Sequence, residues 1–139
     1  MKSIKELYPY DGKYGDKWDL LSDSKPYGYD EIIRSMEYEI QVKSKDNGYS
    51  GDSFYILRNN LGDWGFLTFG WGSCSGCDAL LACETHEELE ELRADLNDSI
   101  KWFDSKKTLQ SYFDDKDWET EWFGRDTTFY SFKDLVMSL

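Results

Sequence analysis

The sequence predicts a single α+β domain in which a small antiparallel meander has several helices packed on one face. Three β-rich segments in the first half are separated by turn residues. Apolar residues then recur at helical spacing in the second half. A chain of 139 residues with 17% aromatic residues is long enough to bury one core. Because it contains no internal repeat, low-complexity tract or linker, residues 1–139 are expected to form one domain.

The first half of the chain supplies the predicted sheet. Residues 1–28 mix Tyr, Gly, Lys and Asp without a sustained period and are expected to be irregular, anchored by aromatic residues. Asp30 can cap a short helix over Glu31–Met36. Three segments rich in β-branched and aromatic residues predict strands, and the Asn and Gly between them favour tight turns. These strands cover Tyr38–Lys45, Ser53–Asn59 and Asp63–Gly70.

The second half predicts helices. Thr85 and Glu88 match the capping box, so a helix should begin there. Its apolar stripe comprises Leu89, Leu92, Leu96, Ile100 and Phe103. Ser105 can cap a second helix. A third is indicated by Phe129, Phe132, Leu135, Val136 and Leu139, while alternation in DWETEWF, around Trp118 and Trp122, predicts a strand.

All three cysteines and the only histidine lie within residues 71–86. Cys74, Cys77, Cys83 and His86 have the residue types of a structural zinc site, and Cys74 and Cys77 have the C-x2-C spacing. The second pair follows too closely for a typical zinc module, and a domain of this size needs no metal to fold. We therefore expect no cofactor, with zinc as the less favoured alternative. Without a metal, Cys77 and Cys83 are expected to be small buried hydrophobic residues, and His86 is expected to lie on the surface in the first turn of the helix.

Two enzymatic patterns are weaker. A glycine turn before a helix could activate the thiol of Cys74 or Cys77, but the sole histidine lies nine residues beyond Cys77 along a predicted helix. Asp30, Glu39 and Lys43 are loosely similar to the carboxylate-and-lysine metal site of some nucleases. Charged residues on an outward strand face produce the same letters by chance.

The charge distribution limits the classes of partner. The formal charge is -12, and residues 84–121 hold 13 acidic and 5 basic residues, which is eight of that excess of twelve. Such a surface repels phosphate backbones and anionic lipid, so we expect no direct binding to nucleic acid or membrane. No apolar run approaches the ~20 residues that span a bilayer, and an odd number of cysteines favours reduced thiols. A cytoplasmic location is expected.

The strongest functional signal is a row of carboxylates on the Thr85 helix. Their spacings of three, one, three, four and three place them on a continuous face beside the leucine stripe. The row comprises Glu84, Glu87, Glu88, Glu91, Asp95 and Asp98. Within the helix only Arg93 and Lys101 could neutralise it. A solvated face explains these residues equally well, but a row of carboxylates also fits a basic groove on a partner, with Trp118 and Trp122 as anchors beside it.

Residues 71–80 (WGSCSGCDAL), with the acidic EELEELR and SIKWFDS that follow, are similar to a group of small, largely uncharacterised bacteriophage proteins over most of the chain. That family carries no assigned activity, cofactor or catalytic residue. The resemblance implies a context: small acidic phage proteins without a catalytic constellation are often inhibitors of host nucleic-acid enzymes or of defence systems. His86 departs from the family pattern, which argues further against a shared zinc site.

The sequence thus favours a non-enzymatic binding protein: a phage-encoded inhibitor, in the host cytoplasm, that presents an acidic helical face to a basic surface on a host nucleic-acid-binding or defence protein. The alternative is a small thiol- or zinc-dependent enzyme centred on Cys74 and Cys77.

Overall fold

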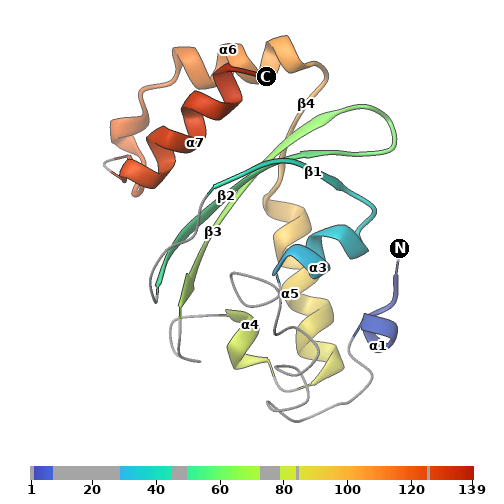
Figure 1. Cartoon of the computed structure of the whole chain (residues 1–139). Coiled ribbons are helices and arrows are strands. Elements are labelled where there is room, and N and C mark those ends of the chain that lie inside the picture. The colour runs from blue at the N-terminus through green and yellow to red at the C-terminus, as the bar shows by residue number, and fades with distance from the viewer. Residues whose placement is uncertain (1, 8–28, 45–49, 73–78, 84, 125) are drawn as a thin grey trace.

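The computed structural model describes residues 2–7, 29–44, 50–72, 79–83, 85–124 and 126–139. Within these residues, four antiparallel strands form one sheet in the order β1-β2-β3-β4 (Figure 1). They are β1 (Glu39–Lys43), β2 (Ser50–Arg58), β3 (Trp64–Gly72) and β4 (Lys101–Phe103). The α+β class and the meander of the first three strands are confirmed.

Helices cover both faces of this sheet, so the prediction of helices on one face was wrong. On one face lie α1 (Ile4–Leu7), α3 (Tyr29–Ser35), α4 (Ala79–Ala82) and α5 (His86–Ser99). On the other lie α6 (Lys106–Asp115), the 3-10 helix η1 (Trp118–Thr120) and α7 (Thr127–Met137). Figure 1 shows α6 and α7 across the sheet from α3 and α5.

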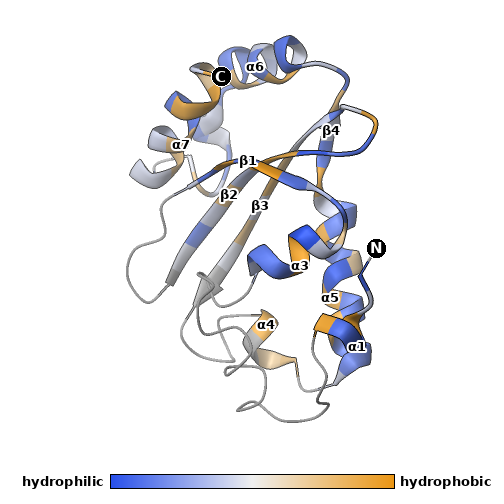
Figure 2. Ribbon diagram, turned by 45° about the vertical axis from the view of Figure 1, so that its right-hand side comes forward, coloured by the Kyte–Doolittle hydropathy of each residue, from blue (hydrophilic) through white to orange (hydrophobic). Residues whose placement is uncertain are grey.

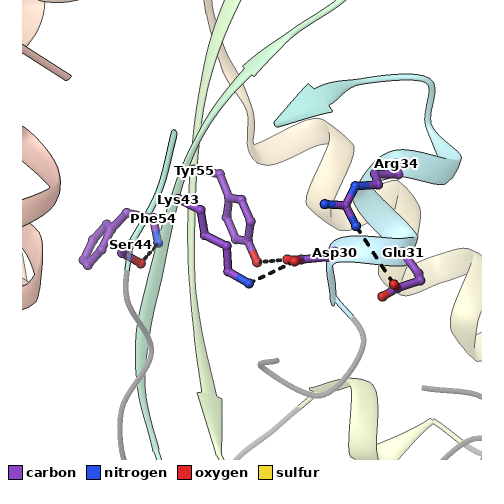
Figure 3. Close-up of polar contacts among 7 residues, drawn as sticks. All are labelled: Asp30, Glu31, Arg34, Lys43, Ser44, Phe54 and Tyr55. Carbon is purple, nitrogen blue, oxygen red and sulfur yellow. Dashed lines mark hydrogen bonds and ion pairs between the residues drawn. The ribbon is translucent and has the colours of Figure 1, made fainter. Parts of the chain in front are cut away.

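The two cores come from the alternation of side chains along β2, where Phe54, Tyr55, Ile56 and Leu57 are all fully buried. Tyr55 and Leu57 pack with the aliphatic residues of α3 and α5, here named the α5 core. Phe54 and Ile56 pack with the helices of the opposite face, here named the aromatic core. Figure 3 shows Phe54 and Tyr55 pointing to opposite sides of the sheet. A continuous apolar run is typical of a strand buried on both faces.

A β-bulge in β1 serves both cores. The pairing of β1 with β2 shifts between Ile40 and Val42. Ile40 packs against the α5 core and Val42 against the aromatic core, although residues two apart on a regular strand share a face. The same shift turns the next residue, Lys43, toward α3, where it contacts Asp30.

The aromatic core contains seven phenylalanines and Trp118, with many ring pairs at 4.7–6.3 Å between centroids. Edge and tilted contacts at such distances stabilise beyond the area they bury. The core residues are Phe54, Ile56, Phe66, Phe103, Leu109, Phe113, Trp118, Phe123, Phe129, Phe132 and Val136. Both long helices of this layer have N-terminal caps. The Ser105 hydroxyl, which was predicted as a cap, accepts from the Thr108 N–H at the start of α6, and the Asp126 carboxylate accepts from the Thr128 N–H at the start of α7.

Three predicted elements differ from the structure. Asp30, the expected cap of a helix over Glu31–Met36, lies inside α3, which begins at Tyr29. The Thr85 helix ends at Ser99, and Phe103 lies in β4 opposite Trp64. Because Leu96 belongs to the α5 core and Phe103 to the aromatic core, the chain must leave the helix to cross the sheet edge. The segment predicted as a strand at Trp118 is a 3-10 turn, in which the Asp117 carboxylate accepts from the Glu119 N–H.

Candidate partner-binding surface

The helix that carries the predicted acidic row is α5. The Thr85 hydroxyl accepts a hydrogen bond from the Glu88 N–H at 3.2 Å, which confirms the predicted cap. Leu89 and Leu96 are buried in the α5 core and Leu92 packs partly against it. The leucine stripe therefore fixes which side of α5 faces solvent.

The predicted carboxylates of α5 lie on that solvent side. Those of Glu87, Glu88, Glu91, Asp95 and Asp98 are exposed, and Glu90, which the sequence reasoning did not single out, is exposed with them. At 100° per residue these six side chains fall within an arc of about 160°. They are named the acidic face below. Glu84 lies outside the described residues. Figure 2 shows hydrophilic colouring over much of α5.

The two bases expected to neutralise the acidic face are engaged elsewhere. Arg93 points away from it: its Nη1 donates to the Lys2 carbonyl at 2.6 Å and lies 3.3 Å from the Ser35 hydroxyl. The Lys101 ammonium lies 5.0 Å from the ring centroid of Tyr112 and 5.8 Å from that of Phe103. Among the described residues, no carboxylate of the acidic face forms an ion pair. None of the described basic residues therefore neutralises the charge of the acidic face.

The structure separates the two predicted tryptophan anchors from the acidic face. Trp118 is 3% exposed, packs inside the aromatic core, and its Nε1 donates to the Phe113 carbonyl at 2.8 Å. It is a core residue, so its prediction as a partner contact was wrong. Trp122 is 66% exposed, but it belongs to the helical layer on the opposite face of the sheet from α5. The pattern of DWETEWF gave no signal that would tell the two apart.

Half of the candidate zinc set falls on described residues. Cys83 is buried in the α5 core and its thiol donates to the Ala79 carbonyl at 3.2 Å. His86 is the first residue of α5 and is partly exposed. Cys74 and Cys77 lie outside the described residues. In the parts of the chain that the structure covers, no three His, Cys, Asp or Glu residues gather in a way that could hold a metal ion.

The charged residues compared with a nuclease site form a contact between α3 and the sheet. The Asp30 carboxylate accepts from Lys43 Nζ at 2.9 Å and from the Tyr55 hydroxyl at 2.6 Å, as Figure 3 shows. Glu39 instead accepts from Gln41 at 3.3 Å in an exposed contact. Since Lys43 and Tyr55 satisfy both oxygens of Asp30, we assign this cluster to positioning α3 on the sheet.

A scan of protein-family models found no match to this chain, and neither did searches of curated proteins and of solved structures. Within the described residues, each helix is too short or too polar to cross a lipid bilayer.

Proposed function

We propose that this protein acts by binding, with the acidic face of α5 docked on a basic surface of a partner that ordinarily holds nucleic acid. In keeping with the resemblance to phage proteins, the proposed role is that of a phage-encoded inhibitor of a host nucleic-acid enzyme or defence protein. The observation that carries the proposal is that none of the described basic residues forms an ion pair with the acidic face, while Arg93 is turned away from it.

The fold itself gains little from this arrangement. Like charges three or four residues apart on a helix cost about 0.2–0.5 kcal/mol per pair. The helix dipole offsets part of that cost in the first turn, which covers Glu87 and Glu88 but not Asp95 or Asp98. From Glu87 to Asp98 the charges extend over about 16 Å of helix. A rigid row of this length can take the place of a run of phosphates in a basic groove.

The test is charge reversal on α5 with a matched reversal elsewhere. Glu91→Lys/Asp95→Lys/Asp98→Lys should slow association with a partner captured from host lysate and then purified. We expect at least a tenfold loss in kon at low salt, because electrostatic steering sets the rate. The wild-type association rate should fall with added salt, because salt screens the charges. DNA should compete with this protein for the basic surface of the partner.

The control is Glu39→Lys/Asp114→Lys/Asp115→Lys, which makes the same change in net charge at exposed positions of β1 and α6. It should retain most of the wild-type rate. Circular dichroism establishes that both variants are folded. Equal rates for the two variants would show that only net charge matters and would overturn the assignment to α5.

A further inference from the structure

Trp122 is the one tryptophan with a described side chain that lies largely in solvent, at 66% exposure. Leaving a large aromatic side chain in water forfeits the free energy that its burial would contribute. Its neighbours in sequence show that the fold could bury rings here, since Trp118 and Phe123 are 3% and 4% exposed. Tryptophan is enriched among the residues that dominate binding energy at protein interfaces, which makes this indole a candidate anchor.

The backbone around Trp122 is held in a fixed turn. The Glu121 N–H donates to the Trp118 carbonyl at 3.1 Å, and the Gly124 N–H donates to the Glu121 carbonyl at 3.0 Å. The turn winds so tightly onto η1 that a Cβ on Gly124 would lie 1.9 Å from the Trp118 oxygen and 2.9 Å from Cα of Glu119. The Trp122 ring packs edge-on against Phe123 at 5.1 Å. A ring held in this way loses little conformational entropy on binding.

A second exposed ring and several carboxylates surround this turn. Tyr130 is 38% exposed and its hydroxyl donates to the Gly124 carbonyl at 2.7 Å. Asp117 and Glu119 are exposed on the η1 side, and Asp134 is exposed one helical turn beyond Tyr130. The nearby cation Lys116 is paired with Glu121 at 2.9 Å. Residues 117–126 hold four acidic residues and one arginine, so the surroundings of Trp122 are negative.

We propose that Trp122 is the anchor of a second docking surface, which takes an arginine side chain from a basic segment of a partner protein. Guanidinium groups stack on indole rings, where the ring face attracts the cation, and the planar fork of Arg can hydrogen-bond to a carboxylate such as Glu119. This surface lies across the sheet from the acidic face and does not depend on the function proposed for α5.

The test uses a short peptide of alternating Arg and Gly, titrated into the isotopically labelled protein and followed by NMR. The indole N–H resonance of Trp122, assigned by its absence in Trp122→Ala, should shift on addition of the peptide. A Lys-Gly peptide of equal charge should bind roughly two- to fivefold more weakly, because the ammonium is more strongly hydrated and cannot stack. Trp122→Ala and Glu119→Lys should each weaken binding of the Arg-Gly peptide by a similar factor. Trp122→Phe should retain part of the affinity that Trp122→Ala loses.

The variant Glu91→Lys/Asp95→Lys/Asp98→Lys separates this proposal from the one for α5. It should leave the shift at Trp122 in place even if it abolishes every shift on α5. If the peptide perturbs only α5 resonances, or if Trp122→Ala binds as tightly as wild type, the docking surface at Trp122 is refuted. Because Trp122 is exposed, Trp122→Ala should melt within about 2 °C of wild type, which excludes unfolding as the cause of any loss.

Discussion

The two helical layers of this protein differ in how they use one sheet. On one face α5 contributes only leucines to its core and turns six carboxylates outward. On the other face α6, η1 and α7 contribute a core dominated by aromatic rings and leave a single tryptophan outside it. The first layer therefore exposes carboxylates, and the second exposes an aromatic ring. Ring contacts stabilise beyond the area they bury, so we expect the costliest single substitutions in the aromatic core, while the attraction proposed for a partner is assigned to the charge on α5.

The largest expected effect is on the aromatic core. Phe113 is fully buried and contacts the rings of Phe66, Trp118, Phe129 and Phe132. Phe113→Ala should lower the free energy of unfolding by about 3–5 kcal/mol, since it removes these contacts and leaves a cavity. Leu57→Ala in the α5 core should cost about 2–5 kcal/mol. Urea unfolding followed by fluorescence and by circular dichroism measures both.

Phe54 and Leu57 lie on the same strand but face different cores. We therefore expect Phe113→Ala and Leu57→Ala each to unfold both layers in a single transition. Leu61→Ala, at an exposed hairpin position, is the control and should change stability by less than about 0.5 kcal/mol. Two separate transitions in either core variant would show that the layers are independent and would break the link drawn between them.

The sequence determined the elements better than it determined their arrangement. The caps at Thr85 and Ser105 were predicted correctly. Each cap side chain accepts from a backbone N–H only three residues later, so the interaction is local and visible in the sequence. The run Phe54–Leu57 contains the signal for a sheet covered on both sides, but continuous apolar letters also fit a short buried helix. Helical spacing could not show where α5 ends, since Ile100 and Phe103 continue the period while serving different cores.

For the candidate surface, the exposed row on α5 was predictable because amphipathic spacing alone divides it from the leucines. The diversion of Arg93 was not, because Lys2 and Ser35, its partners, lie 91 and 58 residues away in sequence. The difference in exposure between Trp118 and Trp122 could not be predicted either. In the predicted strand, residues four apart share a face, whereas the chain turns between Trp118 and Trp122 at Glu121.

A smaller effect is expected at the contact between α3 and the sheet, which bears on the α5 layer alone. Asp30→Ala should cost about 1–3 kcal/mol, because Lys43 and the Tyr55 hydroxyl would each lose a charged hydrogen-bond partner. Tyr55→Phe removes one of these bonds and should cost less, roughly 1 kcal/mol. Thermal unfolding monitored by circular dichroism tests the order. A loss for Tyr55→Phe larger than that for Asp30→Ala would contradict the central place given to the carboxylate.

The smallest expected effect concerns Asp52, which lies on the aromatic-core face of β2, two residues before Phe54. Burial raises the pKa of its carboxyl above the ordinary value of 3.8, and the nearby Asp126 carboxylate raises it further. The folded state therefore holds this proton more tightly than the unfolded chain does. The contribution of Asp52 to stability is most favourable below pH 3.8 and is lost as the pH rises through the raised pKa.

Asp52→Asn removes that charge and should stabilise the protein at pH 7, by less than about 1 kcal/mol because solvent screens a partly exposed group. The melting temperature should rise by no more than about 4 °C at pH 7 and by progressively less toward pH 3. Asp126→Asn keeps a side chain that can still cap α7 and should lower the pKa of Asp52 toward its ordinary range. A pH-independent gain in Asp52→Asn would trace the effect to packing rather than charge, and a loss at pH 7 would mean that the Asp52 carboxylate stabilises this end of the aromatic layer instead of straining it.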